Sequence, residues 1–211
     1  RPGHQAATSV LKNSIELPPA SDPEAADHVL ALTRAWLEHA VIGLNLCPFA
    51  KPVHAREQID YRVSTASNET MLAQELLAAM QSLIETPAEE TDTCLLIHPW
   101  VLQDFMAYND FLDVADALLE EAGLAGVLQI ASFHPDYRFA GTDSDDVTNC
   151  SNRSPFPMLH LLREDSLDKA TAALPDASVI VDRNLATLRA LGQDGWLRLQ
   201  QQIQTAARRK A

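Results

Sequence analysis

Apolar and polar positions follow two different periods along the first two thirds of the chain. Three segments carry apolar residues every three or four positions, the period of an amphipathic helix: residues 23–43, 70–85 and 101–122. Three shorter runs between and after them have strand character: Ile59–Val63, Thr93–Ile97 and Gly126–Phe133. The order of strand, helix, strand, helix and strand is typical of parallel strands joined by crossover helices.

The pattern changes after the third run. Residues 134–157 show no apolar period and predict a long irregular loop, and loops of this length are usually functional or disordered. Four more helices are predicted, at residues 158–163, 167–173, 179–191 and 196–207. We therefore expect a flexible N-terminal arm over residues 1–22 and a single α/β domain over 23–211. Its sheet is predicted to be small, mostly parallel and three- or four-stranded, with crossover helices and a C-terminal helical segment.

The net charge of the chain limits the kinds of partner that it can bind. Lys and Arg total 16 against 29 Asp and Glu, giving a formal net charge of -13. This balance argues against binding of nucleic acid or of an anionic membrane, both of which require a basic surface. No run of eighteen apolar residues occurs, so we expect no membrane span and a cytoplasmic location. The sequence does not indicate an oligomeric state.

Two strand ends carry the same dipeptide. His98 precedes Pro99 after the second strand, and His134 precedes Pro135 after the third. Parallel strands present their carboxyl ends at one edge of a sheet, where open α/β folds bind ligands, so we expect the two imidazoles to converge. Three interpretations stay open: structural residues that cap a helix or bond a carbonyl, a general acid-base pair, or ligands of a divalent metal ion together with Asp136.

A further group of ionisable residues follows the long loop. A helix beginning at Pro157 would place His160, Arg163 and Glu164 on one face, with His160 as a further catalytic candidate. Arg153, Arg163 and Lys51, together with Asn152, are candidates for binding a carboxylate or phosphate, because arginine offers a planar fork that matches such anions. Residues 136–154 are the candidate lid of this site.

The three cysteines are widely spaced and do not form a disulfide framework. Cys94 lies in an apolar run and is expected to be buried. Cys47, followed by Pro48 and Phe49, is similar to the Cys-Pro-aromatic corner of glutaredoxin-like active sites, and is read either as a reactive thiol or as a buried turn residue. Cys150 is expected to be exposed unless the long loop packs over the strand ends.

Four strings resemble the bacterial family called domain of unknown function 1415: Gly43–Ala50, Tyr108–Leu112, Phe133–Tyr137 and Asn152–Pro155. The likeness extends over roughly residues 27–191. It implies that Cys47, His98, His134, Arg153 and His160 belong to the family's pattern, and that a cysteine at position 150 does not. No activity comes with the resemblance.

These observations together predict an enzyme acting on a small anionic metabolite at the carboxyl ends of the strands, with or without a divalent metal ion. His98 and His134 would be the acid-base groups or metal ligands, and Arg153 and Arg163 would bind the anion. Two alternatives stay open: a non-catalytic binding or adaptor domain, and a thiol-dependent protein that uses Cys47.

Overall fold

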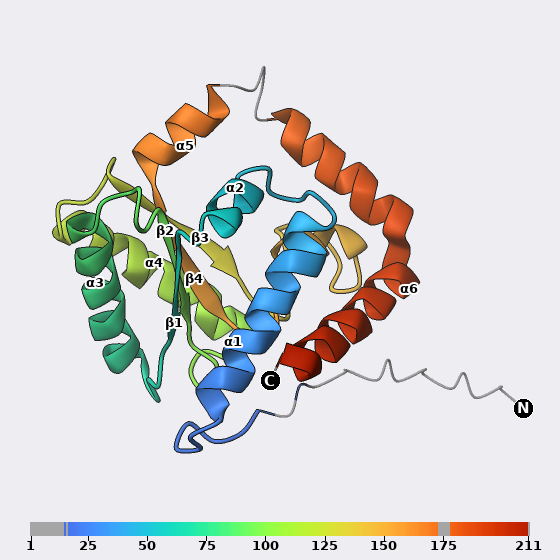
Figure 1. Cartoon of the computed structure of the whole chain (residues 1–211), viewed down its shortest axis with the longest axis horizontal. Coiled ribbons are helices and arrows are strands. Elements are labelled where there is room, and N and C mark those ends of the chain that lie inside the picture. Colours follow the sequence, from blue (N-terminus) through green and yellow to red (C-terminus); the bar gives the residue numbers. More distant parts are fainter. Residues whose placement is uncertain (1–14, 16, 173–177, 211) are drawn as a thin grey trace, which may run out of the picture.

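A four-stranded sheet forms the centre of the molecule (Figure 1). The computed structural model describes residues 15, 17–172 and 178–210. The strands are β1 (Ile59–Val63), β2 (Thr93–Ile97), β3 (Leu128–Phe133) and β4 (Met158–Arg163). Their spatial order is β1-β2-β4-β3. β1 pairs with β2 in parallel, whereas β4 pairs antiparallel with both β2 and β3.

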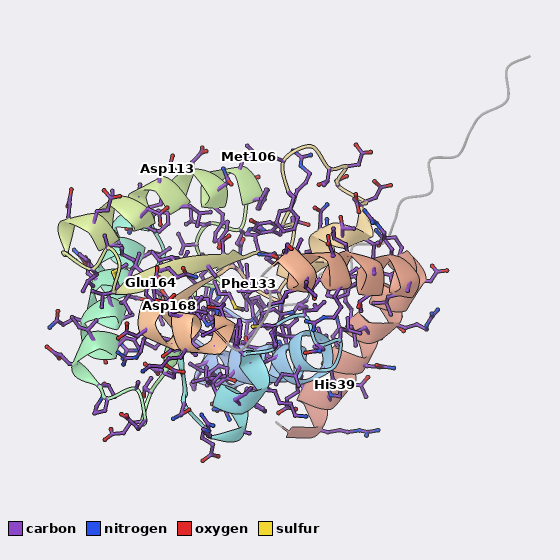
Figure 2. All side chains as sticks on the ribbon, turned by 90° about the horizontal axis from the view of Figure 1, so that it is seen from above. His39, Met106, Asp113, Phe133, Glu164 and Asp168 are labelled. Atoms are coloured by element: carbon purple, nitrogen blue, oxygen red, sulfur yellow. The ribbon has the colours of Figure 1, made fainter. Side chains whose placement is uncertain are left out.

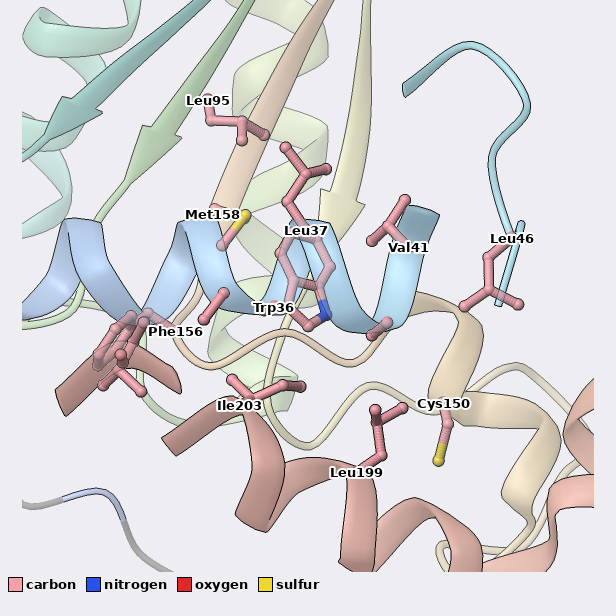
Figure 3. Packing of buried hydrophobic residues seen from close by; sticks show 14 of the residues in the cluster. Trp36, Leu37, Val41, Leu46, Leu95, Cys150, Phe156, Met158, Leu199 and Ile203 are labelled. Atoms are coloured by element: carbon pink, nitrogen blue, oxygen red, sulfur yellow. The ribbon is translucent and has the colours of Figure 1, made fainter. Parts of the chain in front are cut away.

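Helices cover both faces of this sheet. They are α1 (Ala25–Trp36), the π-helix η1 (Leu37–Ile42), α2 (Ala50–Ala55), α3 (Glu69–Glu85), α4 (Phe105–Glu121), the 3-10 helix η2 (Val147–Asn152), α5 (Glu164–Thr171) and α6 (Ser178–Lys210). α3 and α4 pack on one face, where Leu72 and Phe111 lie in one cluster with Leu96. α1, η1 and α6 contribute to a second core on the other face, where Trp36 and Ile203 lie in one cluster with Met158 (Figure 3).

The α/β class and the four-stranded sheet are confirmed, and the sheet is mixed. β1, β2 and β3 run in one direction, as the repeated strand-helix pattern indicates, but β4 is inserted between β2 and β3. The predicted helix over residues 158–163 is wrong, because this segment is β4. A six-residue apolar run has no decisive period by itself, and here pairing with a strand on each side determines its structure.

Both crossover helices begin with a side-chain cap close to the carboxyl ends of the strands that precede them. The Asn68 side chain accepts a hydrogen bond from the backbone N–H of Met71 at the start of α3. Asp104 accepts one from Ala107 at the start of α4. Such caps satisfy backbone donors that the first helical turn leaves unpaired. α4 consequently begins four residues later than the predicted start at residue 101, and residues 98–104 form a loop.

The first predicted helix reaches Gly43, but its last turn is widened. Residues Leu37–Ile42 form a π-helix, and the N–H of Gly43 bonds to the carbonyl of Glu38, five residues earlier. A Cβ at Gly43 would lie 2.2 Å from the carbonyl oxygen of His39. Only glycine therefore fits the close backbone approach that ends this helix.

The C-terminal region follows the prediction of two successive helices. α6 is divided at Gly192, whose φ of 67° and ψ of 175° are not helical. Beyond this kink, Trp196, Leu199 and Ile203 form an apolar stripe that packs into the core beside α1. None of the described helices has the length and apolar character needed to cross a membrane.

The irregular segment after β3 is packed into the helical layer. It contains η2, which contacts α6, and its Asn149 and Cys150 are buried. The indole N–H of Trp36 on α1 donates to the carbonyl of Arg153, at 2.9 Å. The predicted N-terminal arm falls mostly outside the described residues.

Candidate functional site

An open groove of about 570 Å³ lies where β1 and β2 end. Two segments form its walls, one running from the end of β1 into α3 and the other from the end of β2 into α4. We call it the strand-end groove, and its lining residues are Ser67, Asn68, Glu69, Thr70, Val101, Leu102, Asp104 and Ala107. Two helix amino termini and two carboxylates thus meet at the edge where α/β folds hold ligands.

His98 and His134 hold one wall of this groove in place. His98 donates from Nδ1 to the carbonyl of Val101 at 3.1 Å, and His134 donates from Nε2 to the carbonyl of Leu102 at 3.2 Å. Leu102 has a φ of 57°, a left-handed backbone conformation that is uncommon for a side chain of this kind. The two imidazoles therefore stabilise an unfavourable turn whose residues line the groove.

The ring of Tyr108 lies against the rings of both histidines. Its ring centroid lies 5.8 Å from that of His98 and 5.0 Å from that of His134. Its hydroxyl donates to the carbonyl of Met158 at 2.8 Å and accepts from the N–H of Phe133 at 3.0 Å. The expected convergence of the imidazoles is therefore indirect: β4 separates their strands, and a tyrosine from α4 lies against both rings.

Burial keeps both histidines neutral. Each has 0% of its surface exposed. Desolvation lowers the pKa of His98 to about 4, and it also lowers the pKa of His134. His134 is satisfied at both nitrogens, because its Nδ1 accepts from the N–H of Asp136 at 3.0 Å. The Nε2 of His98 has no partner in the described part of the chain. Neither histidine is among the residues that line the groove.

The metal interpretation gains no support from these positions. Asp136 contacts His134 through its backbone N–H. Among the described residues, no three His, Cys, Asp or Glu side chains come together as a group that could hold a metal ion. His98, His134 and Asp136 are all described, so they do not form such a group.

Asn152 and Arg153 connect the end of β3 to the long loop. The side-chain Nδ2 of Asn152 donates to the carbonyl of Ser132, and the backbone carbonyl of Asn152 accepts from the N–H of His134. Arg153 donates to the carbonyls of Tyr137 and Ser144. Both side chains therefore organise backbone near His134, and neither lines the strand-end groove.

Arg163 and His160 are placed by β4, on opposite faces of the sheet. Arg163 donates to the carbonyls of Leu83 and Thr86, at the end of α3 remote from the groove. His160 lies opposite Leu95 in the sheet, and its Nε2 is 2.7 Å from the Thr93 hydroxyl. Burial lowers the pKa of His160 to about 4. The predicted common helix face of His160, Arg163 and Glu164 is wrong, because side chains alternate along a strand.

Lys51 and the proposed lid are not at the groove. Lys51 is exposed on α2, which packs against η1. Within residues 136–154, residues 148–150 are buried and η2 contacts α6, whereas residues 138–141 and 143–145 are exposed, and none of the segment lines the strand-end groove. The anion-binding set predicted from the sequence is therefore not assembled at the carboxyl ends of the strands.

The cysteines have the environments of structural residues. Cys94 is buried, as predicted, and burial raises its pKa to about 12. Cys150 is buried as well, with a pKa raised to about 11, because the long loop packs inward. Burial also raises the pKa of the half-buried Cys47, although the N–H groups of Phe49 and Ala50 oppose that shift. A reactive thiol requires a lowered pKa, so these surroundings do not favour the thiol-dependent alternative.

None of the site residues predicted from the sequence lines the groove. The available signal was the pair of helix caps, Asn68 and Asp104, each a few residues beyond the end of a predicted strand. A cap that follows a parallel strand marks a helix amino terminus at the ligand-binding edge of the sheet.

The fold and this edge define an α/β protein with an open groove at the carboxyl ends of its parallel strands. The chain belongs to the family described as Protein of unknown function (DUF1415), whose model matches residues 28–198. This confirms the family resemblance found in the sequence. No curated protein and no solved structure matches the chain.

Proposed function

We propose that the chain is an enzyme that binds a small polar metabolite in the strand-end groove. The observation that carries this proposal is the position of the groove, at the carboxyl ends of β1 and β2 and between the amino termini of α3 and α4. Open α/β sheets bind their ligands outside the carboxyl ends of their strands. The strained backbone at Leu102 supports the same location, because such conformations concentrate at functional sites.

The roles of the residues differ from the sequence-based hypothesis. His98 and His134 are positioning residues, since their rings are buried and bonded to the wall of the groove. The polar residues that line the groove are Asp104, Glu69, Ser67, Thr70 and Asn68, and we assign the ligand contacts to their side chains. A carboxylate that faces a bound ligand can accept a proton, so Asp104 and Glu69 are the candidate general bases.

The lining also indicates the chemistry of the metabolite. It contains two acidic side chains and no Lys, Arg or His. Carboxylates accept hydrogen bonds and attract positive charge. We therefore propose a ligand that presents hydroxyl or amino groups, in place of the anionic metabolite that the sequence alone suggested.

A conservative substitution tests this site. Asp104→Asn removes one charge but keeps an N-cap residue of equal quality, so folding is retained. A panel of amino sugars, polyols and amino acids would be screened by nuclear magnetic resonance. We expect at least one compound to shift the amides of residues 67–70 and 101–107, and Asp104→Asn to weaken its binding about tenfold.

The matched control is Asp113→Asn. Asp113 is exposed on the outer side of the same helix, α4 (Figure 2), and does not line the groove. It should leave binding unchanged. Equal losses in the two variants, or shifts confined to other parts of the molecule, would contradict the proposed site.

A further inference from the structure

A second groove, of about 490 Å³, lies between η1 and the C-terminal half of α6. We call it the α6 groove. Its polar lining residues are His39, Arg198, Gln201, Gln202, Thr205 and Arg209. His39 lies on η1 beside the C-terminal part of α6 (Figure 2). This groove is on a different part of the molecule and shares no residue with the strand-end groove.

Helical spacing assembles the α6 side of this groove. Arg198, Gln201, Gln202, Thr205 and Arg209 are separated by three or four residues or are neighbours, which places them along one face of the helix. The adjacent face carries the apolar stripe that is fixed in the core against α1. The polar stripe is therefore presented by a helix whose orientation the core determines.

The charge of this groove is opposite to that of the chain as a whole. Its lining contains two arginines and a histidine and no acidic residue, although the chain carries a net charge of -13. Residues 193–210 hold four basic residues and one acidic residue, Asp194. Arg198 and Arg209 are exposed and form no ion pair with any residue that the structure describes. Two guanidinium groups are thus held at an open groove with their donors available.

We propose that the α6 groove binds an elongated small molecule that carries phosphoryl groups. Arginine forks match phosphate oxygens in pairs, and the amides of Gln201 and Gln202 add donors between the two arginines. The arginines are eleven residues apart, which corresponds to about 16 Å along a helix. A ligand with several phosphoryl groups offers oxygens to both arginines and to the glutamines between them, so we assign the groove to an oligophosphate or a nucleotide with several phosphates.

Isothermal titration calorimetry at physiological ionic strength tests this proposal, with tripolyphosphate and ATP as probes. We expect both to bind the wild-type protein and inorganic phosphate to bind far more weakly. Arg198→Gln and Arg209→Gln should each weaken binding at least tenfold, because each removes one charge-assisted contact. Tighter binding of ATP would identify a nucleotide ligand, and equal binding would identify the oligophosphate chain as the recognised group.

The matched control is Arg208→Gln. Arg208 is exposed and adjacent to Arg209 but does not line the groove, so its removal changes net charge equally. We expect its binding to stay within twofold of wild type, with all variants melting at the wild-type temperature. An equal loss in Arg208→Gln, or no binding of either probe to the wild type, would overturn the proposal.

Discussion

The two grooves of this molecule differ in charge and in the way the fold supports them. The strand-end groove is lined by acidic, uncharged polar and apolar residues, and buried imidazoles and a buried tyrosine support its wall. The α6 groove is lined by basic and amide side chains that project from the surface of a helix. The wall of the strand-end groove is strained backbone that buried side chains support. The α6 groove is formed by side chains that recur at helical spacing on α6.

Substitutions at the two grooves should affect the stability of the fold differently. The buried residues that support the strand-end groove, His98, His134 and Tyr108, also stabilise the fold, so changes to them alter stability and binding together. The arginines of the α6 groove are exposed, and surface substitutions of this kind usually change stability by no more than about 0.5 kcal/mol. Stability measurements can therefore separate the two regions before any ligand is known.

The largest expected effect is that of His98→Ala. The change leaves the Val101 carbonyl without its donor and opens a cavity beside Tyr108. We expect the free energy of unfolding to fall by about 3 kcal/mol, the combined order of a lost buried hydrogen bond and a core truncation. Urea denaturation measures this value. If the free energy of unfolding fell by less than about 0.5 kcal/mol, as we expect for Arg209→Gln, His98 would not support the strand-end groove through the core.

His98 should also make the stability of the fold depend on pH. Burial lowers the pKa of His98 from 6.5 to about 4, so between these values the unfolded chain binds a proton that the folded chain does not. Stability is therefore complete above the unfolded value and is lost as the pH falls toward 4. Between pH 7 and pH 5 this residue alone should cost about 2 kcal/mol.

Urea denaturation of the wild type and of His98→Gln at both pH values isolates that term. The variant should lose about 2 kcal/mol less than the wild type over this interval. His39→Gln is the control, because His39 is exposed in the α6 groove and should leave the wild-type dependence intact. Parallel curves for wild type and His98→Gln would show that His98 is not buried as a neutral group.

A smaller effect is expected at the helix cap. Asp104→Ala removes the acceptor for the N–H of Ala107 and should lower stability by about 1 kcal/mol, whereas Asp104→Asn should stay within about 0.5 kcal/mol of wild type. Thermal unfolding of the two variants distinguishes the cap from the charge. If Asn destabilises as much as Ala, the charge of Asp104, and not its capping bond, supports this wall.

The sequence predicted the regular parts of the molecule well, because their periods are local. Strands β1, β2 and β3 and helices α3 and α4 follow from the alternation of apolar and polar positions. β4 was missed because Met158–Arg163 becomes a strand only through partners that are distant in sequence. Because this segment was predicted as a helix, Arg163 was expected at the ligand site, whereas the structure places it at the end of α3.

The structure places the residues of the predicted site in different parts of the molecule. The His-Pro dipeptides correctly marked the carboxyl edge of the sheet, yet burial of both rings depends on Tyr108 and on the loop after β2. The basic face of α6 follows from the helical spacing of Arg198, Thr205 and Arg209 in the sequence. Its pairing with His39 does not, because it requires the packing of α6 beside α1 and η1.

We infer that the chain holds two separate ligand sites of opposite charge preference. The most direct test is nuclear magnetic resonance of the uniformly ¹⁵N-labelled protein, titrated in parallel with tripolyphosphate and with an amino sugar. We predict that tripolyphosphate shifts the amides of His39 and residues 198–209, and that the amino sugar shifts those of residues 67–70 and 101–107. Shifts of one common set of residues by both probes would contradict the account.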